Sequence, residues 1–498
     1  MTQLSRRTIL KAGMAGFAAS AFPGIAFAKA KKEDKKAAKS AAAYDAIVLG
    51  AGAAGLIAAI TAVDSGAKRV AILEQMDRPN GNAIYALGNI CGWGSKRQIR
   101  QGIKDTAEDF YKAMMVTSNW RADPALTRTY TNDIPSGLDW LEENIGIEFG
   151  KVKKAPYPRE WRINPILGKG ITGGSQMVQM LVAAAKKRGV VFLWQHRADK
   201  LITDDHERVI GVEAVAPDGR KKFFTKGGVT IATGGFSANP EMVDKYIGGW
   251  ASRLAIRGSL STTGANISLA LPLNAKFVNM DQFHAGPIIA ETHVNPNEVL
   301  NSGYGIIVDL RGKRFVDEVN TYVIKAKACA QNTIENKAWA IVDADCKVIG
   351  NMTHRFELLN TKYYKADSIE ALAKDINIDP AVLKKDVDDY NNALKNGTLK
   401  QMNPPCSYRQ PHPIAKAPFF AIPYEGGMTA TFGGPLINTK AEVQDTLEGH
   451  SIPGLYAAGN AAGGLFFRDY IGGAQLGGAT VFGRIAGREM AARAKAAK

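Results

Sequence analysis

The stretch YDAIVLGAGAAGLIAAITAVDSGAKRVAILEQ, residues 44–75, constrains the fold of this chain more than any other segment. A short apolar run at 46–49 predicts a buried strand, and small residues at 53–63 predict a helix that packs closely. A second apolar run at 70–73 predicts another strand. A strand, a glycine turn, a helix and a strand in this order are typical of a Rossmann-like α/β domain with a parallel sheet.

The turn between the first strand and the helix has the pattern GxGxxG. Gly50, Gly52 and Gly55 supply its glycines, which allow the backbone to approach a pyrophosphate at the N-terminus of the helix. Glu74 follows the second strand, about twenty residues further on, where a carboxylate can accept hydrogen bonds from a ribose. The pattern therefore predicts dinucleotide binding, with an ordinary tight turn between strand and helix as the alternative.

The rest of the chain is long enough for more than one core. It has 498 residues in total, whereas a single core holds roughly 150. Between 189 and 235, alternating apolar residues predict strands, a hairpin at Pro217–Arg220 and a buried strand that runs into a glycine turn at Val229–Gly235.

A more polar segment follows. Helical periodicity at 368–376 and 380–394 lies within residues 280–415, which we interpret as an inserted lid. The predicted division is a first part of the nucleotide-binding domain at 44–279, a capping or substrate domain at 280–415 and a C-terminal part of the first domain at 416–498.

The N-terminus has the features of an export signal. Arg6 and Arg7 precede a mild apolar run at 12–27. The motif at the end of this run, Ala26-Phe27-Ala28, has small residues at both positions that a signal peptidase recognises. The twin arginine predicts export by the Tat machinery, with cleavage near Ala28 and a soluble periplasmic product that takes up its cofactor before export. The charged segment 29–43 lacks large apolar side chains and is predicted to be a disordered tether.

Net charge and cysteine content limit the classes of ligand and partner that this chain is expected to bind. The net charge is +16, and because residues 1–28 hold three basic residues and no acid, the remainder carries +13. This balance favours anionic substrates, acidic redox partners or simple solubility, and an exported chain without interleaved basic and aromatic residues is not expected to bind nucleic acid. The cysteines, Cys91, Cys329, Cys346 and Cys406, form no CxxC or CxxCH, so we predict no haem and no metal site, while their pairing stays open.

Several spaced motifs together identify a family. They are GAGAAGL with Glu74, NGNAIYALGN, IATGGF, DQFHAGP, LRGKRFVDE, TFGGPLINT, GLYAAGNAAGG and GGATVFGRIAG. In this order they resemble the flavoproteins that include soluble fumarate reductases of the flavocytochrome c type and 3-ketosteroid dehydrogenases. The resemblance covers essentially everything after Tyr44. It implies an FAD-binding domain of the GR2 type with an inserted α+β capping domain that closes over the substrate.

The resemblance also implies where FAD is held. The expected contacts come from the glycine turns and the segments that match them: Gly50, Gly52, Ala53, Ala54, Gly55, Glu74, Asn82, Ala83, Thr233, Gly234, Gly459, Asn460, Gly473, Ala474 and Leu476. Residues 466–484 are expected to close on the flavin ring, with Gly472 and Gly473 in backbone contact and Gly477 and Gly478 opening the next helix. Since no histidine follows Glu74 closely, we expect noncovalent FAD.

The catalytic residues depart from the fumarate reductase pattern. His284 of DQFHAGP matches one expected histidine, but Tyr322 and Tyr470 stand where two arginines are expected. Thr429 or Ala430 replaces the second histidine. An arginine grips a carboxylate through two bonds, whereas a tyrosine offers one O–H that donates a bond or a proton. A substrate with two gripped carboxylates is therefore not expected.

Roles follow from these matches. Tyr322 and Tyr470 are predicted to be catalytic, as the matching tyrosines of ketosteroid dehydrogenases are, with ordinary packing as the alternative. His284 is predicted to act in catalysis or substrate binding, or else to be a structural histidine. Arg257 and Arg468, with Thr429, are candidates to hold a single carboxylate, with ion pairing as the alternative.

The segment LRGKRFVDE is predicted to have a structural role and not a catalytic one. We expect it to form a β-turn that supports the lid, with Arg314 and Glu318 in structural roles.

These observations predict an oxidoreductase of CH–CH bonds. It would reduce an α,β-unsaturated carboxylate or carbonyl compound as a terminal reductase of anaerobic respiration, with hydride from flavin N5 and a proton from a tyrosine. Electrons would come from a separate cytochrome c or a membrane quinol dehydrogenase. The alternatives are an α,β-dehydrogenase of the 3-ketosteroid or tricarballylate type and a flavin electron carrier without turnover.

Overall fold

The stretch that opens the ordered chain folds as its sequence predicts. The computed structural model describes residues 43–155, 158–296, 298–299 and 303–497. The predicted strand, helix and strand at 44–75 are β1 (Ala46–Leu49), α2 (Ala53–Asp64) and β2 (Val70–Glu74). The α/β prediction and the position of the glycine turn are confirmed.

Two predictions concern the start of the chain. The export signal at 1–28 and the tether at 29–43 lie outside the described residues, except for Ala43. Within the described ranges, no helix is both long enough and apolar enough to cross a bilayer.

The first sheet places the glycine turn between buried strands. In the described chain it has six strands in the order β18-β19-β9-β1-β2-β5, and all neighbours are parallel except the edge pair β18–β19. The further bounds are β5 (Val191–Trp194), β9 (Val229–Ile231), β18 (Glu442–Gln444) and β19 (Ser451–Ala457). Because β1 lies between β9 and β2, the turn after β1 opens at the carboxyl ends of these central strands, where ligands of such sheets bind.

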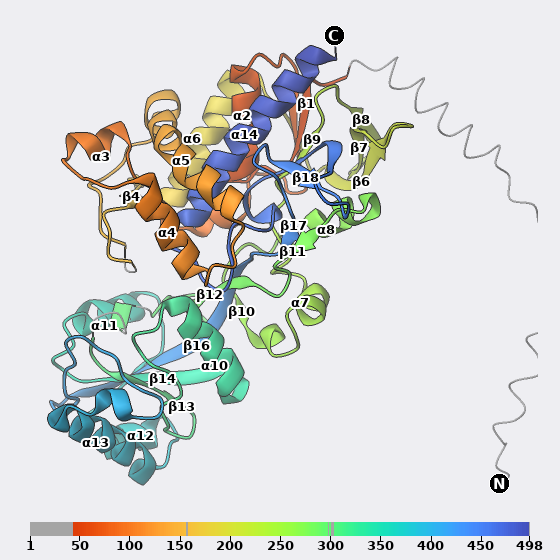
Figure 1. The fold of residues 1–498 in the computed structure, drawn as a ribbon. Coiled ribbons are helices and arrows are strands. Elements are labelled where there is room, and N and C mark those ends of the chain that lie inside the picture. Colours follow the sequence, from red (N-terminus) through yellow and green to blue (C-terminus); the bar gives the residue numbers. More distant parts are fainter. Residues whose placement is uncertain (1–42, 156–157, 297, 300–302, 498) are drawn as a thin grey trace, which may run out of the picture. The chain divides into compact units, whose positions relative to one another are not determined.

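Two helices made of small residues pack side by side over this sheet (Figure 1). They are α2 and the C-terminal α14 (Ala474–Ala496). A Cβ at Gly483 would lie 2.8 Å from the Ala54 carbonyl oxygen, and a Cβ at Gly487 would lie 2.4 Å from that of Ala58. The glycines of α14 therefore allow its backbone to contact α2, which explains why both segments are rich in Gly and Ala.

The predicted hairpin forms in a separate small sheet. In the described residues it has the strands β6 (Arg197–Thr203), β7 (Val209–Ala216) and β8 (Gly219–Phe224). The β7–β8 connection falls at the predicted Pro217–Arg220 turn, so this prediction is confirmed.

The long strand β16 (Phe419–Thr431) organises the second sheet. It pairs with four strands, β10 (Ala255–Ile256), β12 (Phe283–Ile288), β14 (Lys337–Val342) and β15 (Tyr364–Ala366), and β13 (Ile306–Asp309) adds to β14. Alternate residues of its strands face two different apolar clusters, as the period of a strand requires. Since β16 lies after residue 415 and its partner β10 lies before 279, this sheet crosses both predicted boundaries. The division at 279 and 415 stays a prediction.

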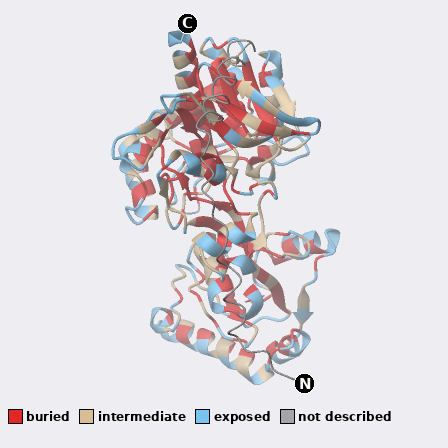
Figure 2. Cartoon of the chain, turned by 90° about the vertical axis from the view of Figure 1, so that its right-hand side faces the viewer, coloured by how far each residue is buried: buried red, intermediate tan, exposed pale blue. Residues whose placement is uncertain are grey.

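The remaining elements surround these sheets, and buried residues run along the strands (Figure 2). Their bounds are β3 (Asn89–Cys91), α3 (Lys96–Arg100), α4 (Ala107–Thr117), α5 (Pro124–Trp140), β4 (Ile163–Pro165), α6 (Gly173–Lys187), α7 (Pro240–Tyr246), α8 (Ala265–Ala270), β11 (Phe277–Val278), α10 (Tyr322–Asn332), α11 (Ile349–Leu358), α12 (Ile369–Asp375), α13 (Pro380–Asn396) and β17 (Gly434–Pro435). The helices α12 and α13 confirm the periodicity at 368–376 and 380–394.

Local details both confirm and correct the sequence analysis. Residues 309–313 form the predicted turn, and Arg314 and Glu318 form a buried ion pair of 2.6 Å. The helix expected to open at Gly477 begins three residues earlier at Ala474, because Gly473 takes a positive φ of 90° at its N-cap. All four cysteines are buried, and none of them forms a disulfide in the structure.

Candidate active site

The glycine turn after β1 leaves a cradle for a ligand. Gly50 has φ 105°, and a Cβ there would lie 2.6 Å from the Ala232 carbonyl oxygen. A Cβ at Gly55 would lie 2.0 Å from the Gly50 carbonyl oxygen, so only glycine allows this turn to close. No side chain caps the N-terminus of α2 at Gly52, and its first N–H groups are therefore available to an anion.

Glu74 lies next to the glycine turn, at the same end of the site. Its carboxylate is buried, and it accepts hydrogen bonds from the Ala51 N–H at 2.8 Å and the Met76 N–H at 3.0 Å. Burial raises the pKa of Glu74, and these backbone donors oppose the rise. Each carboxylate oxygen keeps a lone pair free, so Glu74 can still accept hydrogen bonds from hydroxyl groups.

A cavity of about 2410 Å³ extends from this turn to the predicted catalytic residues. All six predicted catalytic and substrate-binding residues line it. So do thirteen of the predicted cofactor residues: Gly50, Gly52, Ala53, Ala54, Glu74, Asn82, Ala83, Thr233, Gly234, Gly459, Asn460, Gly473 and Leu476. Gly55 and Ala474 do not line it. Gly55 packs against Gly50, and Ala474 is fully buried at the start of α14.

Two tyrosines meet at one end of the cavity. The hydroxyl oxygens of Tyr322, the first residue of α10, and Tyr470 lie 2.7 Å apart. In such a pair one hydroxyl donates and the other accepts, so the accepting tyrosine keeps its own O–H free. Desolvation by the surrounding protein raises the pKa of both phenols, and the positive charge of Arg257 opposes this at each. Both tyrosines are therefore neutral donors at neutral pH.

A buried aspartate holds the two tyrosines in place. Asp469 accepts hydrogen bonds from the Thr321 hydroxyl at 2.6 Å and from the Tyr470 N–H at 2.8 Å. Thr321 is also the N-cap of α10, directly before Tyr322. Because one carboxylate binds Thr321, next to Tyr322, and the backbone N–H of Tyr470 itself, it fixes α10 against the loop that carries Tyr470.

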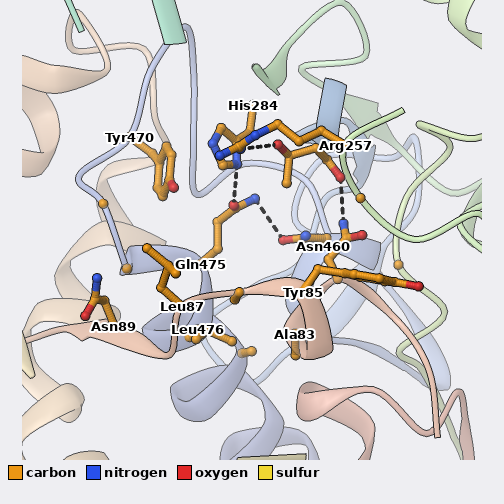
Figure 3. A pocket seen from close by; sticks show the side chains of 18 of the residues that line it. Ala83, Tyr85, Leu87, Asn89, Arg257, His284, Asn460, Tyr470, Gln475 and Leu476 are labelled. Atoms are coloured by element: carbon orange, nitrogen blue, oxygen red, sulfur yellow. Dashed lines mark hydrogen bonds between the residues drawn. The ribbon is translucent and has the colours of Figure 1, made fainter. Parts of the chain in front are cut away.

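His284 lies beside the rings of both tyrosines, and Figure 3 shows it next to Tyr470 and facing Gln475 of the C-terminal segment. Its ring centroid is 4.5 Å from that of Tyr470. Its Nδ1 is 3.0 Å from Gln475 Oε1, and Gln475 Nε2 donates to Asn460 Oδ1 at 3.2 Å. With this amide orientation Nδ1 carries the proton and Nε2 is an acceptor. Burial lowers the pKa of His284 well below its usual value, so the ring is neutral.

Arg257 and Arg468, both predicted as candidates to hold a carboxylate, have different surroundings in the structure. Arg257 donates from Nη1 to the Thr429 hydroxyl at 2.8 Å, beside His284. Arg468 also lines the cavity, but its exposed guanidinium donates to Asn119 Oδ1 at 2.9 Å. The structure therefore brings Arg257 to Tyr322, Tyr470 and His284, and directs the Arg468 side chain elsewhere.

The glycine cradle, Glu74 and the long cavity are the features of a dinucleotide site, and a family comparison agrees. The family model described as "FAD binding domain" matches residues 45–481. The chain belongs to this family. The predicted fold and FAD as cofactor are thereby confirmed, whereas noncovalent attachment stays a prediction.

Known proteins of similar sequence and structure include two groups of flavoenzymes. The acrylate reductase flavoprotein subunit of Shewanella woodyi is 28% identical, with 98% of each chain covered. The open conformation of a flavocytochrome c3 fumarate reductase superposes with a TM-score of 0.79 at 27% identity, covering 93% of this chain and 81% of that chain. The 3-ketosteroid-Δ4-(5α)-dehydrogenase of Rhodococcus jostii gives 0.74 at 25% identity, covering 90% and 96%. Both predicted resemblances are confirmed, and the protein is an FAD-dependent oxidoreductase.

The residues of the cavity fit FAD. The cradle at Gly50 and the free N–H groups of α2 suit a pyrophosphate, and Glu74 suits ribose hydroxyls. Asn460 offers an amide where the sequence analysis expected a contact to the ribityl chain. Gly472 has open space around its Cβ position, which leaves room for a flat ring beside the backbone.

Gln475 is a site residue that sequence analysis missed. It lines the cavity and joins His284 to Asn460 through its amide. The signal available in the sequence was a polar residue within the glycine-rich segment 472–478, at the position between two predicted contacts, Ala474 and Leu476.

Proposed function

We propose that this flavoprotein reduces the C=C bond of an α,β-unsaturated carboxylate or carbonyl compound. The observation that carries the proposal is the hydrogen-bonded pair of Tyr322 and Tyr470 at the end of the FAD cavity, with Arg257 and His284 beside it. The names of the acrylate reductase and fumarate reductase relatives support an enoate as substrate.

Reduction needs a hydride and a proton on adjacent carbons. Bound FAD, in its reduced form, supplies the hydride. The proton comes from the tyrosine whose O–H is not engaged in the phenol pair, and it goes to the carbon next to the carboxylate or carbonyl group. The partner tyrosine keeps its hydrogen bond to the oxygen that has lost its proton. This bond stabilises the phenolate until solvent returns the proton.

The surroundings of the tyrosines set the protonation state of the proton donor. Dehydrogenation needs a base that removes a proton from the substrate, and for a tyrosine this base is the phenolate. Desolvation raises the pKa of Tyr322 and Tyr470, so both hydroxyls are protonated before reduction begins. Because proton donation leaves the same phenolate that would remove a proton in dehydrogenation, the redox potentials of the flavin and the substrate set the direction. Asp469, near both hydroxyls, raises their pKa further.

The second candidate function is α,β-dehydrogenation of a ketosteroid-like substrate. One observation favours it: two tyrosines line the cavity where the sequence analysis, through the resemblance to 3-ketosteroid dehydrogenases, expected catalytic tyrosines. The overall similarity to the Rhodococcus jostii dehydrogenase agrees with this alternative. A flavin carrier without turnover is less supported, because the cavity holds donors beyond those a flavin site needs.

We also propose a location and an electron source. The SRRTILK motif supports export to the periplasm through the Tat machinery, where NAD(P)H is absent. Two electrons per turnover would then come from a separate cytochrome c or a membrane quinol dehydrogenase. The Shewanella woodyi relative supports a separate donor, since its name describes a flavoprotein subunit.

A substrate panel tests the proposed reaction. The purified flavoprotein is assayed for oxidation of reduced methyl viologen by acrylate, methacrylate, fumarate, urocanate and cinnamate. In parallel it is assayed for dehydrogenation of 3-ketosteroids with an artificial electron acceptor. We expect turnover with an enoate and none with a steroid. Steroid dehydrogenation without enoate reduction would overturn the proposal in favour of the second candidate.

A further inference from the structure

The side chain of Arg257 lies in a seat formed by two glycines. Its backbone N–H donates to the Met428 carbonyl at 2.8 Å, which extends the pairing of β10 with β16 by one residue. A Cβ at Gly286 would lie 2.6 Å from Nη1 and 2.7 Å from Cζ of Arg257, and a Cβ at Gly427 would lie 3.2 Å from its Cβ. The guanidinium therefore rests on the bare backbone of β12, and any larger residue at Gly286 would displace it.

The hydroxyl of Thr429 fixes the guanidinium from the other side. Arg257 Nη1 donates to Thr429 Oγ1 at 2.8 Å, and Asn82 Nδ2 donates to the Thr429 carbonyl at 2.9 Å. Asn82 thus connects the seat to the predicted cofactor contacts. Such a seat holds one rotamer of a long side chain, which lowers the entropy that a ligand must remove on binding.

This arginine has no carboxylate partner among the described residues, although it is half-buried. Its printed hydrogen bond goes to the neutral Thr429, and a guanidinium has five N–H donors. An unpaired cation in a partly desolvated cavity binds an anion strongly, because the charge-assisted bonds replace lost hydration. The charge of Arg257 is felt at His284, Tyr322 and Tyr470, so a carboxylate bound to it lies at the catalytic end of the cavity.

The neighbours of Arg257 do not provide a second carboxylate site. His284 is neutral, and its Nε2 is a buried acceptor without a partner in the described residues, which repels a carboxylate oxygen. The Arg468 guanidinium is bound to Asn119, and the buried Lys325 donates to the Glu318 carbonyl at 3.0 Å. The Tyr322 and Tyr470 hydroxyls bind each other and carry no charge.

We propose that Arg257, supported by Thr429 and seated on Gly286, binds the single carboxylate of the substrate, so that this enzyme selects monocarboxylic enoates over dicarboxylic ones. The proposal rests on the proposed function and specifies its substrate class. It assigns Arg257 as a substrate-binding residue and Gly286 as a positioning residue.

Charge removal at Arg257 tests the assignment against a neutral substrate of the same shape. Charge-assisted hydrogen bonds contribute about 1.5–3 kcal/mol, which corresponds to about a 10- to 150-fold change in binding. For Arg257→Gln we therefore expect kcat/KM for acrylate to fall by about 10- to 150-fold, while kcat/KM for methyl acrylate changes by no more than about 3-fold. Arg257→Lys, which keeps the charge but loses the planar fork, should fall between the two.

Arg253→Gln is the matched control. Arg253 is four residues away, donates to the Ala330 carbonyl at 2.6 Å and does not line the cavity. We expect its kcat/KM for acrylate to equal that of the wild type. Gly286→Ala leaves Arg257 in the chain but removes its seat, so a rise in KM for acrylate with unchanged FAD content would show that position matters as well as charge.

A binding measurement separates failure of this inference from failure of the proposed function. Propionate, a saturated monocarboxylate, is titrated into the oxidised holoenzyme, and its Kd is read from the flavin absorbance change. If the wild type binds propionate and Arg257→Gln does not, the carboxylate site stands even if no enoate is reduced. Equal loss of acrylate and methyl acrylate activity, unchanged propionate affinity, or faster turnover of fumarate than of acrylate in the wild type would overturn it.

Discussion

The bond between Tyr322 and Tyr470 leads to a quantitative prediction about replacing each tyrosine by phenylalanine. Their oxygens are 2.7 Å apart, so removal of either hydroxyl breaks the same hydrogen bond. Phenylalanine keeps the ring and its packing against His284 while it removes the proton donor. The perturbation therefore acts on the proton and on the bond that stabilises the donor's charge.

The magnitude follows from the role of a general acid. Loss of a positioned proton donor slows a reaction by about 10²- to 10⁴-fold, or about 3–5 kcal/mol in the barrier. Because the two hydroxyls form one unit, the effects of the two changes should not multiply. We expect the double variant to be no slower than the slower single variant, within about 3-fold.

The assay is steady-state oxidation of reduced methyl viologen at saturating enoate, with FAD content and propionate affinity measured on each variant. Tyr424→Phe is the matched control, because Tyr424 is fully buried in β16, does not line the cavity, and its hydroxyl has no hydrogen-bond partner in the described residues. Its kcat should equal that of the wild type.

Two results would contradict the reasoning. If either single variant kept the full rate with FAD bound, that hydroxyl would not take part in proton transfer. If the two losses multiplied in the double variant, the tyrosines would act independently, and the 2.7 Å bond would have no catalytic meaning.

Three further predictions concern the cofactor, pH and the buried ion pair of Arg314 and Glu318. Gly55→Ala should yield protein without flavin colour, because its Cβ would lie 2.0 Å from the Gly50 carbonyl oxygen; normal FAD content would contradict this. The pKa of His284 is lowered in the folded state, so unfolding takes up a proton below pH 6.5 and the folded state loses stability as the pH falls. Between pH 7.5 and 5.5, the free energy of unfolding in urea should fall by about 1.4 kcal/mol more in the wild type than in His284→Asn. Arg314→Met should cost about 3–5 kcal/mol in the free energy of unfolding, since it leaves Glu318 charged and buried; a loss below about 1 kcal/mol would show that the pair is not stabilising.

The sequence predicted those features whose causes are local. The strand, turn and helix at 44–75 depend on apolar runs and on glycines that are adjacent in the chain, and they form as expected. Arg314 and Glu318, four residues apart, were expected to have structural roles, and they form a buried ion pair. The start of α14 was misplaced, because Gly473 and Gly477 look alike in sequence and only the backbone at Gly473 takes the left-handed cap.

Contacts between distant segments could not be predicted from one sequence. Gln475 meets His284 across 191 residues, and Asp469 meets Thr321 across 148. Arg468 has a φ of 61° and its side chain binds Asn119, and nothing in the local sequence RDYIGG indicates this conformation or this partner. Only the folded chain shows that Arg257, and not the Arg468 guanidinium, lies with the tyrosines.

The order of strands in the two sheets has a consequence for synthesis on the ribosome. The second sheet needs β16 to join β12 and β14, so it is complete only when the chain has been made to residue 431. The first sheet needs β19 to join β9, so it is complete only at residue 457. The cavity also needs residues 459–476 from the end of the chain. Flavin capture must therefore be a post-translational event, and a nascent chain stalled before this region would expose apolar strands and depend on chaperones.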